Sequence, residues 1–261
     1  MTGPRRGAGM WAVVAVAVFA SLLGGCGGGG KSVLRVSAAS SLGLAFAAYG
    51  RQFRPASTSF SFAGSDQLAA QIREGARPDV FASANEALPD QLYAAGALER
   101  PVVFAVNRLV IAVPAGSHTV RSLADLAKPG VTIAAGSPSV PVGTYTRKVL
   151  AGLPSGQRTA TLANVRSEEP DVAGIVGKLT EGAVDAGFVY VTDVQGARGA
   201  LTAVELPASL RPRVAYAAGV VRGAPHPAQA RAFIRGLLGG VGRAALLRAG
   251  FEAPPAGQPG T

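Results

Sequence analysis

Four segments of the chain place a hydroxyl or a backbone amide where a helix is expected to begin. These positions are Ser41, Ser65, Val142 and Val172. The first N–H groups of a helix have no partner within the helix, and the helix dipole is positive at that end. Each start can therefore contact an anion. The chemistry expected from these residue types is recognition of an oxyanion by hydroxyls and amides, without Lys or Arg.

Each of these starts has a purely structural alternative. Serine is a favoured N-cap residue, so Ser41 and Ser65 can act only as caps. Two prolines, Pro141 and Pro170, suit a first helical turn. The prediction of an anion site therefore depends on convergence of the four starts in one cleft.

The composition excludes several other classes of protein. The chain has 261 residues, of which 48% are hydrophobic and 15% charged, which argues against disorder. Its net charge is +10, but the basic residues are scattered and aromatic residues make up only 6%, so we expect no nucleic-acid partner. One Cys and two His leave little for a metal site or a catalytic triad. No G-x-S-x-G motif supports a serine hydrolase.

The amino terminus has the pattern of an export signal. Arg5 and Arg6 precede an apolar run from Met10 to Leu23, which is too short to span a membrane. The run leads into LGGC, which resembles a bacterial lipobox. This resemblance predicts that the chain is cleaved before Cys26, which becomes the new amino terminus and is lipidated. The alternative is a plain secretory signal with an incidental cysteine. We expect residues 1–26 to be the signal and its cysteine, and 27–32 to be a Gly-rich tether.

From residue 33 onward, strand and helix patterns alternate, which predicts an α/β fold with parallel βαβ units. The tail, 253–261, is rich in Pro and Gly and is expected to be loose. The expected strands are 33–37, 58–62, 80–83, 109–113, 131–135, 184–190, 202–206 and 214–221. The expected helices are 41–53, 66–74, 86–95, 122–127, 143–150, 171–181, 228–238 and 241–249. Two lobes with a cleft between them follow if the strands near Leu109 and Val214 cross from lobe to lobe.

Four segments, in this order, resemble the molybdate-binding proteins of bacterial ABC importers over about residues 33–252. They are VSAASSLGLAF, FSFAGSDQLAAQIREGARPDVFASAN, GSPSVPVGTYTRKVL and EEPDVAGIVGKLTEGAVDAGFVYVTDV. The chain differs from the family at three places. Asp66 follows Ser65, Val142 replaces the usual Ala, and Glu169 with Pro170 alters the residues before Asp171.

The resemblance implies the periplasmic-binding-protein type II fold, with two hinge-crossing strands and a ligand cleft between lobes. Lobe 1 would comprise 33–110 and 214–252, and lobe 2 would comprise 111–213. It also implies a set of ligand-binding residues. Ser41 and Ser65 would donate hydroxyls and amides, Val142 and Val172 backbone N–H groups, and Tyr190 its phenolic O–H.

The function implied is that of a monomeric, lipid-anchored, extracytoplasmic solute-binding protein. It would deliver molybdate, or tungstate, to an ABC permease, without catalysis and without a cofactor. Two alternatives stay open. One is a binding protein for another oxyanion, such as sulfate or thiosulfate, or for an organic anion. The other is a periplasmic enzyme of the prephenate dehydratase type on the same fold, for which Asp66 or Asp171 would have to supply the general acid.

Overall fold

The computed structural model describes residue 3 and residues 32–255, and their strands form two separate sheets. The expected signal segment with Cys26, most of the tether and residues 256–261 lie outside the described residues. Within the described part, no helix has the length and apolar character needed to cross a membrane. The predicted α/β class is confirmed, although both sheets are mixed rather than wholly parallel.

The first sheet has the strand order β2-β1-β3-β10-β4. Its strands are β1 (Val33–Ala39), β2 (Ser57–Ala63), β3 (Val80–Ser83), β4 (Val102–Asn107) and β10 (Val214–Val220). Strand β1 runs parallel to β2 and β3, whereas β10 runs antiparallel to β3 and β4.

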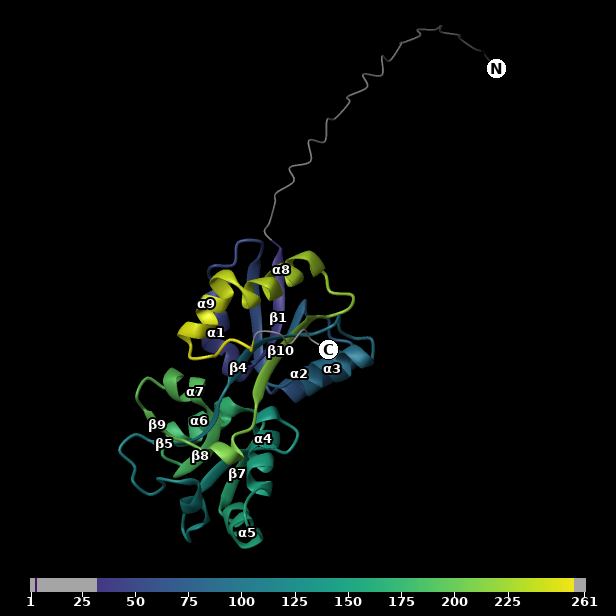
Figure 1. Cartoon of the computed structure of the whole chain (residues 1–261). Coiled ribbons are helices and arrows are strands. Elements are labelled where there is room, and N and C mark those ends of the chain that lie inside the picture. Colours follow the sequence, from purple (N-terminus) through teal and green to yellow (C-terminus); the bar gives the residue numbers. More distant parts are fainter. Residues whose placement is uncertain (1–2, 4–31, 256–261) are drawn as a thin grey trace. The chain divides into compact units, whose positions relative to one another are not determined.

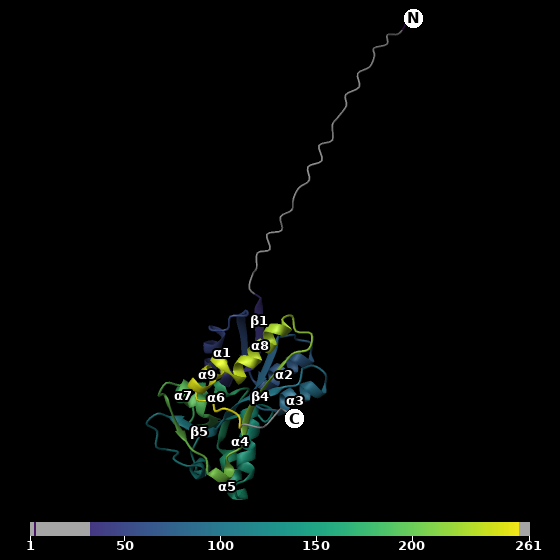
Figure 2. The same ribbon diagram turned by 45° about the horizontal axis from the view of Figure 1, so that its top comes forward.

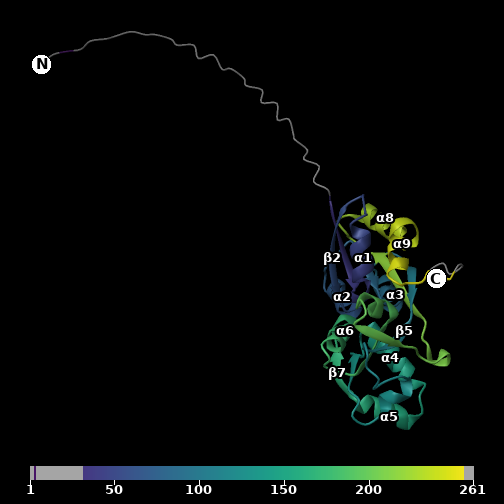
Figure 3. The ribbon, with the colours of Figure 1, turned by 90° about the vertical axis from the view of Figure 1, so that its left-hand side faces the viewer.

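The second sheet has the matching order β7-β6-β8-β5-β9. Its strands are β5 (Leu109–Pro114), β6 (Ile133–Gly136), β7 (Val165–Glu169), β8 (Ala186–Tyr190) and β9 (Leu201–Val204). Strand β6 is parallel to β7 and β8, and β5 is antiparallel to β8 and β9. Figures 1 and 3 show the two sheets lying end to end, each with helices on both faces.

Helices cover the first sheet on both sides. They are α1 (Gly43–Gly50), α2 (Ser65–Arg73), α3 (Ala87–Ala94), α8 (Pro227–Leu238) and α9 (Gly240–Arg248). On one face, α1, α8 and α9 lie together, as Figure 2 shows, and bury an aromatic cluster around Phe46, Tyr49 and Phe233. On the other face, Leu68 and Ile72 of α2 pack with Leu92 of α3. We call this sheet with its helices the first lobe.

The second lobe is the second sheet with α4 (Pro141–Ala151), α5 (Ser155–Ala163), α6 (Val172–Thr180) and α7 (Val191–Gly196). Successive residues of a strand face opposite sides of a sheet. Accordingly, Phe188 lies beside α4 and α5, while Gly187 lies against Ile175 of α6. A Cβ at Gly187 would come within 2.5 Å of the Ile175 side chain, so glycine lets α6 approach closely. Three short 3-10 helices, η1 (Ser40–Leu42), η2 (Leu123–Ala127) and η3 (Ala208–Leu210), complete the two lobes.

The crossings between lobes differ from the prediction. We expected the strands near Leu109 and Val214 to cross, but each lies wholly in one sheet. The first crossing is made by Arg108 alone, between β4 and β5, and the second by residues 205–213, between β9 and β10. The chain therefore leaves the first sheet at Arg108, whereas the expected boundary between the two lobes lay between residues 110 and 111. Arg108 also pairs with Glu205 of the second crossing at 2.8 Å, which links the two crossings.

Candidate functional site

The five predicted ligand residues all follow, or end, a strand that is parallel to its neighbour. Ser41 and Ser65 each lie two residues beyond the last residue of β1 and β2, which end at Ala39 and Ala63. The starts of α4 and α6 follow β6 and β7, and Tyr190 is the last residue of β8. The carboxyl ends of parallel strands in α/β sheets are the usual place for a ligand.

All five residues line one small cavity, which takes its walls from both lobes. The full lining is Ala39, Ser40, Ser41, Ala63, Gly64, Ser65, Ala84, Val140, Pro141, Val142, Asp171, Val172 and Tyr190. The convergence on which the prediction depended is thus present in the structure. This lining contains no Lys or Arg, so the donors available to an anion there are hydroxyl and amide groups.

Neither serine acts as a helix cap. Ala39 and Gly64 occupy the N-cap positions of η1 and α2. The Ser41 hydroxyl instead lies 2.8 Å from the Tyr216 hydroxyl, and the Ser65 hydroxyl accepts a hydrogen bond of 3.2 Å from the Ala84 N–H. Ser65 is 1% exposed, so its hydroxyl lies at the cavity wall with almost no access to bulk water. The structural alternative, in which these serines only cap, is therefore wrong.

The second lobe offers backbone amides at two helix starts. In α4, Pro141 stands in the first turn and no side chain caps the helix, so the Val142 N–H has no partner within the helix. In α6, the Asp171 side chain caps the next two N–H groups, Ala173 at 2.7 Å and Gly174 at 3.1 Å. This cap does not take up the Val172 N–H. The Asp171 carboxylate is thus directed to its own helix, and Val172 keeps a donor for the cavity.

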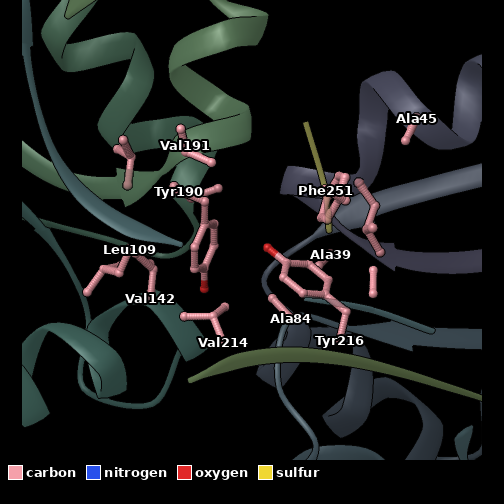
Figure 4. Close-up of a cluster of buried hydrophobic side chains, with 14 of the residues drawn as sticks. Ala39, Ala45, Ala84, Leu109, Val142, Tyr190, Val191, Val214, Tyr216 and Phe251 are labelled. Atoms are coloured by element: carbon pink, nitrogen blue, oxygen red, sulfur yellow. The ribbon is translucent and has the colours of Figure 1, made fainter. Parts of the chain in front are cut away.

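Tyr190 brings a hydroxyl to the cavity that has no hydrogen-bond partner among the described residues. The residue is 1% exposed, and its ring packs edge-on against Tyr216 with the centroids 5.8 Å apart (Figure 4). Burial raises the pKa of Tyr190 well above its ordinary value, so the hydroxyl keeps its proton and can donate. A buried polar atom without a partner is costly, which is a feature expected of a ligand contact.

The charged residues singled out from the sequence lie outside this lining, apart from Asp171. Asp66 does not line the cavity; its Oδ2 accepts a hydrogen bond of 2.6 Å from Ser139 of the second lobe. Arg147 of α4 pairs with Glu168 at 2.7 Å and lines a different cavity. The described residues contain no cluster of His, Cys, Asp and Glu that could hold a metal ion.

Sequence reasoning missed two buried polar residues behind the cavity, Tyr216 and Asn107. Tyr216 stands in the apolar strand β10, where it reads as a core aromatic, and it contacts Ser41 only because β10 lies beside β3. Asn107 ends β4, and its side-chain nitrogen lies 2.9 Å from the Thr192 hydroxyl and 3.5 Å from the Tyr216 hydroxyl. A polar side chain at the end of an apolar run was the available signal for Asn107, whereas Tyr216 lies inside its apolar run and gave none.

The family model described as bacterial extracellular solute-binding protein matches residues 34–252. The chain belongs to this family. A molybdate-binding protein of Mycobacterium tuberculosis is 38% identical to this solute-binding protein over 232 residues, which covers 87% of the chain and 86% of the relative. The resemblance inferred from the four segments is therefore confirmed.

Two solved structures show the same fold. The periplasmic molybdate-binding protein of Azotobacter vinelandii matches with a TM-score of 0.75 and 23% identity, over 85% of this chain and all (100%) of that one. The sulfate-binding protein SubI of Mycobacterium tuberculosis also matches with a TM-score of 0.75, at 16% identity, over 85% of this chain and 87% of that one. The predicted two-lobe fold is confirmed. Because relatives named for two different oxyanions match it equally well, fold alone does not choose the ligand of this solute-binding protein.

Proposed function

We propose that the chain captures molybdate, with tungstate as a second ligand, and delivers it to an ABC permease. One observation carries this proposal. Donors from both lobes, Ser41 and Ser65 on one side and Val142, Val172 and Tyr190 on the other, line one cavity that has no cationic side chain. The similarity to the mycobacterial molybdate-binding protein supports the choice of oxyanion.

The donors suit a tetrahedral dianion. Each oxygen of such an anion is an acceptor, and hydroxyl and amide N–H groups can donate to it from several directions. A hydrogen bond to a charged acceptor contributes roughly 1.5–3 kcal/mol, so about six of them contribute roughly 9–18 kcal/mol, and the upper part of this range exceeds an association cost of about 4–15 kcal/mol. The remainder is consistent with micromolar or tighter affinity.

The absence of Arg from the lining argues against a carboxylate or phosphate ligand, which bidentate Arg usually binds, and is compatible with molybdate, tungstate or sulfate. Size would then separate molybdate and tungstate from sulfate. Sulfate is the smaller anion, so donors spaced for the longer metal–oxygen bonds would leave some of its oxygens poorly bonded.

Binding would stabilise the closed arrangement of the lobes. A ligand held by both lobes has its full affinity only when both contact it, so it shifts the population toward closure. The closed form is what a permease would need to distinguish from the unliganded protein. Both walls of the cavity come from a single chain, which supports action as a monomer.

Capture and release need no covalent chemistry, and we propose that the protein is a transport component rather than an enzyme. The Asp171 carboxylate is engaged with two N–H groups of its own helix, which leaves it poorly placed as a general acid. We also propose an extracytoplasmic location with a lipid anchor on Cys26, which rests on the LGGC sequence. Replacing Cys26 with Ser should release the protein from the membrane fraction, and retention would refute the anchor.

Calorimetric titration of the full chain in mild detergent tests the ligand. We expect saturable heat with molybdate and tungstate, and much weaker heat with sulfate and phosphate. Binding of sulfate or thiosulfate with no response to molybdate would favour the alternative oxyanion. Turnover of a prephenate-type substrate that is lost in an Asp171→Asn variant would instead support the enzyme.

A further inference from the structure

A line of buried polar groups runs from the cavity to the first crossing between lobes. The Ser41 hydroxyl lies 2.8 Å from the Tyr216 hydroxyl, and the Asn107 side-chain nitrogen lies 3.5 Å further on. Ser41, Tyr216 and Asn107 are all buried. Figure 4 shows the Tyr216 side chain extending from the first lobe toward Tyr190 of the second. Groups that water does not reach must satisfy one another, so the direction of each hydrogen bond is constrained.

The direction is set at Asn107. The backbone N–H of Arg108 donates to the Asn107 Oδ1 over 2.8 Å, and a backbone N–H can only donate. The other amide atom is therefore Nδ2, which also can only donate. It donates to the Thr192 hydroxyl at 2.9 Å and faces the Tyr216 hydroxyl at 3.5 Å. The Tyr216 oxygen is thus turned toward a donor on this side.

Asn107 Nδ2 cannot accept the Tyr216 proton, and the Ser41 oxygen, 2.8 Å away, is the acceptor available to it. Burial raises the pKa of Tyr216 well above its ordinary value, so the hydroxyl keeps the proton that it donates. Once the Ser41 oxygen accepts this hydrogen bond, the Ser41 hydroxyl does not donate its own proton to Tyr216. The proton is left for a direction toward the cavity, which Ser41 lines.

We propose that Tyr216 is a positioning residue that holds the Ser41 hydroxyl with its proton directed at the bound oxyanion. This inference rests on the proposed function, because it concerns a donor to that ligand. Tyr216 does not itself line the cavity. It acts through Ser41, and its contribution must therefore vanish when the Ser41 hydroxyl is removed.

A double-mutant cycle measured by calorimetry with molybdate tests this prediction in the full chain. Tyr216→Phe should weaken binding about five- to tenfold, since an unrestrained Ser41 hydroxyl must be ordered on binding. In a Ser41→Ala background, the same change should cost less than about twofold. Tyr49→Phe is the matched control, because Tyr49 is a buried tyrosine whose hydroxyl donates to the Phe233 carbonyl away from the cavity.

Each outcome separates the two proposals. Unchanged affinity in Tyr216→Phe, or equal losses with and without the Ser41 hydroxyl, would overturn the positioning role and leave the proposed function standing. Wild-type protein that binds no molybdate would overturn the proposed function itself.

Should Tyr216→Phe fail to fold, Asn107→Asp provides the second variant. It puts an acceptor where Nδ2 donates, so it should weaken binding with Ser41 present and not in Ser41→Ala. A loss independent of Ser41 would again refute the role.

Discussion

The Ser139 hydroxyl donates a 2.6 Å hydrogen bond to Asp66 Oδ2, and this contact joins the second lobe to the first beside the cavity. Ser139 precedes α4, and Asp66 stands in the first turn of α2. Both elements supply proposed ligand residues. The hydrogen bond can therefore form only while the lobes hold the arrangement that encloses the cavity.

Removing this contact should favour opening. We expect Ser139→Ala to weaken molybdate binding about two- to tenfold, mainly through faster dissociation, because an exposed hydrogen bond contributes about 0.5–1.5 kcal/mol. Stopped-flow displacement would measure the rate. Thr144→Ala is the matched control, since the Thr144 hydroxyl bonds the Pro138 carbonyl within the second lobe. Equal effects of both changes would contradict a cross-lobe contribution.

The two serines should behave as ligand donors. Ser41→Ala and Ser65→Ala are each expected to weaken anion binding by roughly 1.5–3 kcal/mol, the contribution of a hydrogen bond to a charged acceptor. Calorimetry gives the affinity, and thermal melting without ligand separates binding from folding. Ser65→Ala also leaves the Ala84 N–H without its partner, so a modest loss of stability is expected for that variant alone. Full affinity in both variants would exclude the hydroxyls from the site.

Tyr190→Phe should change stability and affinity in opposite senses. The Tyr190 hydroxyl is buried without a partner, so its removal should leave the unliganded protein as stable as the wild type, or more stable by about 1 kcal/mol. Molybdate binding should weaken at least tenfold, since a donor is lost. Chemical denaturation with and without ligand checks both. A variant that binds molybdate like the wild type would show that Tyr190 is only a core aromatic residue.

Gly64 should be required for closure. A Cβ at this position would collide with the carbonyl oxygen of Pro170 in the second lobe and lie 2.8 Å from Asp66 Oδ1. Gly64→Ala should therefore fold but fail to close, with molybdate affinity reduced more than tenfold. Small-angle scattering with and without ligand would report closure. Gly43→Ala, where a Cβ meets nothing within 4 Å, is the control and should bind normally.

Asp193 should make stability depend on pH. Burial raises the pKa of its carboxyl to about 7, so the folded protein holds a proton there that the unfolded chain has released. The resulting stabilisation is present below about pH 4 and is lost as the pH rises to about 7. Asp193→Asn keeps an acceptor for the Tyr190 N–H. Its free energy of unfolding, relative to that of the wild type, should therefore rise by about 1–2 kcal/mol between pH 5 and pH 8. Urea unfolding at both pH values measures this, and a constant difference would refute it.

The sequence predicted the elements with strong periodicity and the residues that follow their ends. Ser41, Ser65, Val142, Val172 and Tyr190, which line one cavity, could be proposed as ligand residues because the same four local patterns recur in a known family. Other elements gave no usable pattern. Strand β7 has the polar sequence VRSEE, and it is a strand because it pairs with β6 at the edge of the sheet. Helix α5, SGQRTATLA, likewise lacks an apolar stripe and has a single fully buried residue, Thr161.

Contacts made by residues far apart in the sequence could not be predicted. Capping by Ser41 and Ser65, the alternative that the sequence left open, is not seen, and the two hydroxyls contact the Tyr216 hydroxyl and the Ala84 N–H instead. Tyr216 lies 175 residues from Ser41, and no local pattern encodes that pairing. The same holds for Asp66, whose partner Ser139 belongs to the other lobe.

The unequal lengths of the two crossings have a mechanical consequence. One connection is the single residue Arg108, whereas the other spans residues 205–213. A one-residue connection allows torsion but almost no translation, so the lobes must swing about an axis that passes close to Arg108. Parts of the lobes far from Arg108 would then travel farthest, while those beside it, such as Asn107, would stay nearly stationary. An incoming anion would thus enter from the side away from Arg108, where the lobes separate most.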